Sequence, residues 1–142
     1  MKFLLKESYL KTIKNSVGRK LFRNLYYEIE ERGPTDILEN GVLSCAVYVS
    51  WIMKIFDLIK EGHATVDGTI KDLEKSSWQK VRKPKIGAIL IWKEQRYDSG
   101  LHKHIGFYIG DEKAISNSYK LKTPVKHHWT FGSKNDKNYR KV

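Results

Sequence analysis

One cysteine and one histidine are the residues of this sequence best suited to covalent chemistry. The cysteine is Cys45, and the histidine is His104, which directly precedes the alternating segment IGFYIG. A thiolate is the reactive form of cysteine, and a nearby imidazole can take the thiol proton and hold the resulting ion pair. A third polar side chain can then fix which ring nitrogen carries the proton. These residue types therefore predict a thiol nucleophile with a histidine base.

Each of these residues also has a plainer interpretation when it is taken alone. A buried cysteine often fills a core, and a histidine can simply end a strand at the surface. His102 would point to the same side as His104 if the strand began two residues earlier. Asn117, within SNSYK, could be a turn former. The order of the residues, and the presence of a single cysteine, favour the joint interpretation.

Helices are expected first along the chain. Apolar residues at helical spacing predict a helix over 8–32, which the Gly33-Pro34 pair would end. A second, largely apolar helix is predicted over 43–60, with Cys45 in its first turn. The backbone N–H groups and the positive end of that helix favour a thiolate. A short helix follows His63, with Thr65 or Asp67 as its cap.

Strands are expected after Pro84. Apolar and alternating segments predict strands over 87–92, 104–110, 113–118 and 124–131, with a polar loop over 93–103. Their short connections predict an antiparallel meander, so the fold class is α+β. The expected organisation is one domain over 1–142. Its parts are an N-terminal helix over 1–34, a catalytic core over 43–131 and a basic tail over 132–142, which is expected to fray.

The composition limits what else the chain can be. The 142 residues carry 27 Lys and Arg against 16 Asp and Glu, a net charge of +11, so the surface attracts polyanions or serves solubility. The single cysteine excludes an intramolecular disulfide and a cysteine-built metal cage. The histidines lack zinc-ligand spacing, and we expect neither metal nor cofactor. No apolar run suits a signal peptide or a membrane span, so a soluble monomer is expected.

Three segments of the chain share features with one known family. These are SCAVYVSW from Ser44, KPKIGAILIW from Lys83 and HKHIGFYIGDEKAIS from His102. Together they resemble the three blocks of the NlpC-type papain-like cysteine peptidases, and the CHAP amidases share the layout. The resemblance implies N-terminal helices packed on a small antiparallel sheet, with Cys45 as nucleophile and His104 as general base. It also implies cleavage of peptide stems in bacterial cell walls.

The third catalytic residue remains open between neighbouring positions. Direct counting from His104 falls on Ser116, where the family often has a histidine, but Asn117 is the better orienter because its amide oxygen can accept an imidazole N–H. We predict Asn117, assuming one extra residue in the turn at 111–112, with Ser116 and His128 as alternatives. His128 would line the site or bond to a turn. The resemblance also implies that the stretch containing His63 and Thr65 lines the substrate.

The expected function is a hydrolase that cleaves a peptide or amide bond through an acyl-thiol intermediate. The backbone N–H of Cys45 would help to hold the oxyanion. A transferase or deamidase would share the same acyl step, so it remains an alternative. A non-catalytic module that binds nucleic acid or another polyanion is the alternative from a different class.

Overall fold

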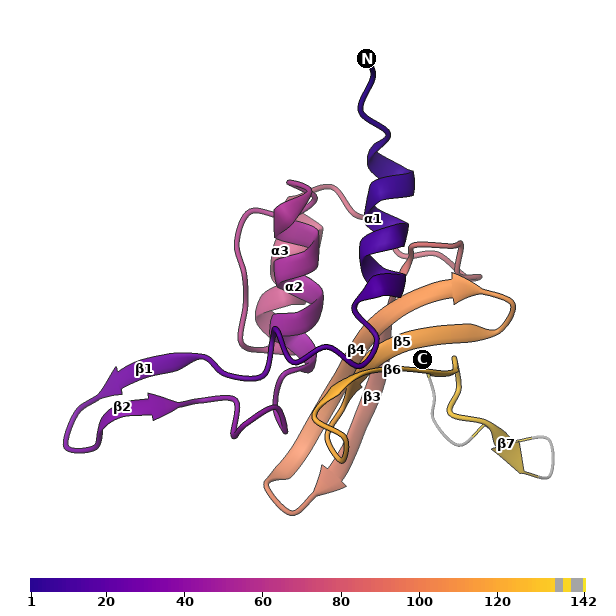
Figure 1. Ribbon diagram of the computed structural model, residues 1–142. Coiled ribbons are helices and arrows are strands. Elements are labelled where there is room, and N and C mark those ends of the chain that lie inside the picture. Colours follow the sequence, from indigo (N-terminus) through magenta and orange to yellow (C-terminus); the bar gives the residue numbers. More distant parts are fainter. Residues whose placement is uncertain (135–136, 139–141) are drawn as a thin grey trace.

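Three helices precede the main sheet along the chain (Figure 1). The computed structural model describes residues 1–134, 137–138 and 142, and its helices are α1 (Leu5–Asn15), α2 (Cys45–Ile55) and α3 (Val66–Lys75). α2 is apolar on most sides and largely buried, as predicted, although it ends five residues early. Of the two candidate caps, Thr65 and Asp67, the first begins α3, since Thr65 Oγ1 accepts the N–H of Gly68 at 3.0 Å.

A four-stranded antiparallel sheet forms the second half of the fold. Its strands pair in the order of the chain, which confirms the predicted meander and the α+β class. They are β3 (Ile89–Tyr97), β4 (Gly100–Gly110), β5 (Lys113–Ser118) and β6 (Thr123–His128). The predicted polar loop over 93–103 is wrong, because this segment continues β3 and β4 as a long hairpin.

The two faces of this sheet have different partners. On one face, the helices cover apolar side chains that form the main core with Tyr48 and Ile52 of α2. The other face carries Trp92, His104 and Ser116. Directly opposed residues project to the same side, and Trp92 opposes His104 across β3 and β4. The alternation of β4 therefore places His104 on the face away from the main core.

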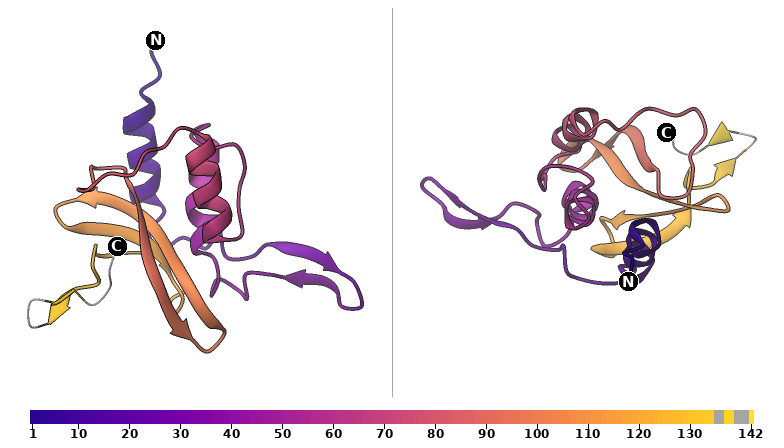
Figure 2. Two further views of the ribbon diagram at one scale, coloured as in Figure 1. Left: turned by 180° about the vertical axis from the view of Figure 1, so that it is seen from behind. Right: turned by 90° about the horizontal axis from the view of Figure 1, so that it is seen from above.

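The N-terminal segment differs from the predicted helix over 8–32, which is wrong beyond Asn15. Gly18 adopts a φ of +74°, which interrupts the helix, and its N–H donates to the carbonyl of Pro124 at 2.8 Å. The chain then forms a hairpin of β1 (Tyr26–Ile29) and β2 (Gly33–Asp36), which projects from the rest of the molecule (Figures 1 and 2). Aromatic residues in β1 favour a strand, and Gly33-Pro34 begins a strand here.

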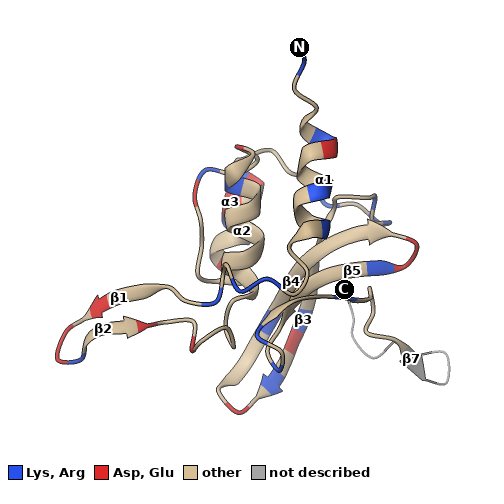
Figure 3. Ribbon diagram, in the orientation of Figure 1, with Lys and Arg blue, Asp and Glu red and all other residues tan. Residues whose placement is uncertain are grey.

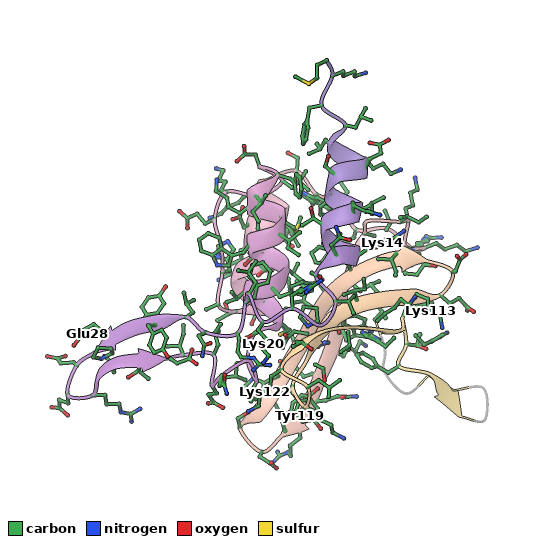
Figure 4. All side chains as sticks on the ribbon, in the orientation of Figure 1. Lys14, Lys20, Glu28, Lys113, Tyr119 and Lys122 are labelled. Atoms are coloured by element: carbon green, nitrogen blue, oxygen red, sulfur yellow. The ribbon has the colours of Figure 1, made fainter. Side chains whose placement is uncertain are left out.

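Charge is unevenly distributed between this hairpin and the rest of the chain. Figure 3 shows acidic residues on the hairpin, whereas the charged residues of α1 are mostly Lys. In Figure 4, Glu28 lies on the hairpin, while Lys20 and Lys122 lie at its base. Arg23 joins the base to the β5–β6 turn, since its guanidinium donates to the carbonyl of Lys122 at 3.1 Å.

The remaining described residues add a short hairpin at the C-terminal end. It consists of β7 (Ser133–Lys134) and β8 (Lys137–Asn138), so part of the tail that was expected to fray is paired. Residues 135–136 and 139–141 of that tail lie outside the described residues. Among the helices described, none is both long enough and apolar enough to span a bilayer.

Candidate functional site

A cleft of about 1310 Å³ is lined by residues from both the helical half and the sheet half of the fold. Its walls come from the start of α2, the start of α3, the β3–β4 hairpin and the β5–β6 hairpin. The side chains in it include Cys45, Thr65, His104, Ser116 and Asn117. The structure therefore brings the predicted nucleophile, the predicted base and two of the three candidates for the third residue, Ser116 and Asn117, to one cavity.

Cys45 is the first residue of α2 and is partly buried. The preceding Ser44 occupies the N-cap position, but its side chain makes no capping hydrogen bond. Its hydroxyl is fully buried and has no hydrogen-bond partner among the described residues. Because no side chain caps this helix end, the partial positive charge of the first turn is available to stabilise an anion at Cys45.

Asn117 supports the loop in front of α2. It is 4% exposed, and its amide nitrogen donates to the carbonyl of Gly41 at 2.8 Å. The predicted contact between Asn117 and His104 is replaced by one from Ser116, because neighbouring residues of a strand project to opposite faces. The turn at 111–112 has two residues of positive φ, as in a two-residue hairpin turn, so the extra residue assumed there is absent. The register instead shifts by one residue between Tyr108 and Gly110 of β4, and this shift places Ser116 opposite Gly106.

Three side chains on adjacent strands form a continuous hydrogen-bonded chain. His104 Nε2 lies 2.8 Å from Ser116 Oγ, and Ser116 Oγ lies 2.7 Å from His127 Nε2. The other ring nitrogen of His127, Nδ1, lies 2.7 Å from the backbone carbonyl oxygen of His128. These hydrogen bonds thus connect His104 in the cleft, through the buried hydroxyl of Ser116, to His127 and the backbone carbonyl of His128.

Aromatic rings enclose the two imidazoles of this chain. The indole of Trp92 is fully buried, with its centroid 5.2 Å from that of His104 and 5.7 Å from that of His127. Phe131 stacks on His127 with centroids 4.1 Å apart and planes 17° apart. Trp92 is itself held by a 2.7 Å bond from its Nε1 to the carbonyl of Trp129. These rings limit rotation of both imidazoles and restrict the access of water.

The residues predicted to contact substrate separate into two groups. Thr65 lines the cleft, but His63 and His128 are not among the described residues that line it. His63 Nε2 instead lies 2.7 Å from Asp72 Oδ2, and His128 Nδ1 lies 2.8 Å from Thr130 Oγ1. Both therefore support the structure, the plainer role open to a polar residue near a turn or helix end. His102 lines the cleft within the β3–β4 hairpin and bonds to Ser99.

Two carboxylates outside the cleft hold the loops that shape it. Burial by itself raises the pKa of Asp72, but hydrogen bonds from His63, two backbone N–H groups and Ser76 outweigh it and lower that pKa. Burial likewise acts to raise the pKa of Asp36, yet three backbone N–H groups and the Asn24 amide lower it to about 2. Neither carboxylate belongs to a metal site, since the described residues contain no suitable cluster of His, Cys, Asp or Glu.

Three residues of the site were not predicted from the sequence: His127, Trp92 and Phe131. The alternation of β6 contains a partial signal, because His127 opposes Ala114 and so shares a face with Ser116. Because His127 and His128 are neighbours in a strand, only one of them can face the site. The spacing did not show which of the two faces Ser116, since that depends on the register of β5 and β6.

The chemistry of this cleft can be read from its own residues. No family model matches the chain, and a comparison with curated proteins finds no match. A thiol at a helix N-terminus and a tethered imidazole in one cleft are the components of acyl transfer to sulfur. No metal is needed for such a step, because the imidazole can carry the proton.

Proposed function

We propose that the protein is a cysteine hydrolase that cleaves a peptide or amide bond. His104 takes the thiol proton, and the Cys45 thiolate attacks the carbonyl carbon. The C–N bond then breaks, and the amine leaves with the proton from His104. Water attacks the acyl-thiol, the C–S bond breaks, and the thiol and imidazole return to their starting state.

The observation that carries the proposal is the shared cleft of Cys45 and His104. The two residues are 59 positions apart in the sequence and come from different layers, yet both line the same cavity. Ser116 holds one nitrogen of His104 at 2.8 Å, which leaves the other for the thiol proton. The uncapped first turn of α2 favours the thiolate and supplies N–H groups for an oxyanion.

The resemblance suggests the substrate class, a peptide of the bacterial cell wall, and an NlpC- or CHAP-type papain-like fold. The order of a helix with an N-terminal cysteine, followed by an antiparallel meander with the histidine strand second, is compatible with that fold. An open cleft of about 1310 Å³ can accept an extended peptide. Bacterial wall peptides are therefore the first substrates to assay.

Substitution of Cys45 tests the mechanism directly. Cys45→Ala should abolish hydrolysis of muropeptides or purified cell wall and leave thermal unfolding nearly unchanged, because the side chain is small and partly exposed. Cys45→Ser serves as the matched control for size. Hydrolysis by the alanine variant at the wild-type rate would refute the mechanism.

The ionisation of the thiol can be tested without a substrate. Iodoacetamide should alkylate Cys45 below neutral pH faster than it alkylates a model thiol, whose pKa is near 8.5. His104→Ala should reduce this difference to the part that the first turn of α2 supplies. An alkylation profile equal to that of the model thiol in the wild-type protein would exclude the ion pair.

The net charge of +11 favours a second candidate, a binding module for nucleic acid or another polyanion. Such binding should fall steeply as salt rises, whereas hydrolysis of a small peptide should change little. Binding with that salt dependence, together with an unreactive Cys45, would replace the hydrolase proposal. A transferase or deamidase would share the acyl-thiol step, and release of product to an added amine would identify a transferase.

A further inference from the structure

We infer that His127 is a positioning residue that acts through the Ser116 hydroxyl to determine which nitrogen of His104 carries a proton. The inference rests on the proposed function, because its effect on rate requires His104 to be the base for Cys45. The hydrogen bonds themselves can be examined without any activity.

The carbonyl of His128 fixes the state of His127. A carbonyl oxygen can only accept, so the 2.7 Å contact with His127 Nδ1 requires a proton on that nitrogen. In neutral His127, the other nitrogen, Nε2, is then an acceptor. Phe131 stacks on this ring with planes 17° apart, and Trp92 lies beside it, which opposes a ring flip that would exchange the nitrogens.

The Ser116 hydroxyl passes this polarity to His104. Its proton points to His127 Nε2, 2.7 Å away, because that nitrogen offers a lone pair. The serine oxygen must then accept the proton on His104 Nε2 at 2.8 Å. Neutral His104 therefore carries its proton on Nε2, and its Nδ1 keeps the lone pair that can take the thiol proton.

A serine needs such a partner, whereas a carboxylate or amide oxygen does not. A hydroxyl donates and accepts equally well, so without His127 its proton can turn to His104 Nε2. That reversal would place the His104 proton on Nδ1 and remove the base. The structure thus assigns to His127 the role of keeping the hydroxyl in its accepting orientation toward His104.

Nitrogen-15 NMR of the Cys45→Ala protein reads these proton positions in the neutral rings. The ¹⁵N chemical shifts of an imidazole separate protonated from unprotonated nitrogens. We expect the proton on Nε2 in His104 and on Nδ1 in His127. The opposite tautomer in either ring would overturn the inference, whether or not the protein is a hydrolase.

Variants at His127 test the direction of control. In His127→Phe, the tautomer of His104 should shift toward Nδ1–H, and adding Ser116→Ala should reverse that shift by removing the hydroxyl. His127→Gln should keep the Nε2–H form, since the amide oxygen can accept from Ser116. His128→Gln is the matched control: it removes a ring that bonds to Thr130, retains the backbone carbonyl and should leave the tautomer unchanged. An unaltered His104 tautomer in His127→Phe would refute the inference that His127 determines which nitrogen of His104 is protonated.

Kinetics then separate positioning from a structural role. His127→Phe should lower kcat by roughly 10- to 100-fold with little change in KM, below the 10⁴-fold loss seen when a triad tautomer is fully reversed. His127→Gln should recover most of kcat, and thermal unfolding reports the fold of each variant. If the wild type hydrolyses peptides and His127→Phe keeps its kcat, the inference fails while the hydrolase stands. If Cys45 is inert but the tautomers are as expected, the hydrolase fails and the hydrogen-bonded chain stands.

Discussion

Gly106 is the position where one added methyl group should disturb the placement of His104 more than the rest of the fold. A Cβ atom at Gly106 would lie 2.7 Å from both the Ile115 carbonyl oxygen and Ser116 Cβ, and 3.0 Å from Trp92. These neighbours are a strand backbone and a fully buried indole, so no flexible side chain can move aside. Because ordinary contact begins at 3.4 Å, Gly106→Ala must move β4 from β5 by 0.7 Å, the difference from 2.7 Å.

The displacement acts directly on His104, two residues away in the same strand. Added to the present 2.8 Å, it carries His104 Nε2 to about 3.5 Å from Ser116 Oγ, which is outside hydrogen-bond range. Overpacking costs about 1–3 kcal/mol and a lost hydrogen bond about 1 kcal/mol, so the free energy of unfolding should fall by about 2–4 kcal/mol. A misplacement of this size should lower kcat by roughly 100-fold.

Urea unfolding and the rate of Cys45 alkylation below neutral pH are the assays for Gly106→Ala. Gly62→Ala is a matched control, because its Cβ would also overlap a tryptophan ring, that of Trp51, which is 42% exposed and can swing outward. The control should lose less stability and keep the wild-type alkylation rate. If Gly106→Ala is as stable and as reactive as the wild type, the close approach of β4 and β5 does not hold His104 in place.

Two carboxylates should give distinct effects on stability. Asp36→Asn should lower the free energy of unfolding by about 1–2 kcal/mol near pH 7. Because the pKa of Asp36 falls from 3.8 to about 2 on folding, the difference from wild type should be complete above pH 4 and shrink as pH drops toward 2 in urea titrations; a constant difference would exclude this cause. Asp72→Asn should cost about 3 kcal/mol, since Asp72 is 5% exposed and accepts from Lys60, Glu61 and Ser76. His63→Gln is its milder comparison, and equal losses in the two would contradict a network centred on the carboxylate.

Local patterns predicted the elements whose residues all favour one structure. The strand predicted over 113–118 has the bounds of β5, and Thr65, one of the two candidate caps, starts α3. In both places, the alternation or the capping chemistry agrees with the tertiary contacts. The apolar residues of 8–32 fit a helix equally well by spacing, but those after Asn15 pack elsewhere. Helical period alone cannot show that Gly18 will turn the chain toward β6.

The candidate nucleophile and base of the site were predictable, but the hydrogen bonds that connect its residues were not. Residue chemistry indicated Cys45 and His104, because one is the single thiol and the other heads an unusual strand. The choice between Ser116 and Asn117 depends on the register of β4 and β5, which shifts by one residue between Tyr108 and Gly110. His127 depends on the register of one more strand. Each added strand multiplies the number of possible registers, so the contacts of Ser116 and His127 cannot be predicted from local sequence patterns.

The charges that line the cleft bear on the choice between the two candidate functions. Carboxylates and cations are nearly balanced there: Glu39, Asp67, Glu94 and Asp98 against Arg96, Lys103 and Lys120. The net charge of +11 therefore resides on other surfaces, for example around Lys14 and Lys113 (Figure 4). A polyanion would bind these outer surfaces, since a balanced cleft offers it little attraction. Polyanion binding and peptide hydrolysis would thus use separate regions, and the first could hold the second near an anionic wall.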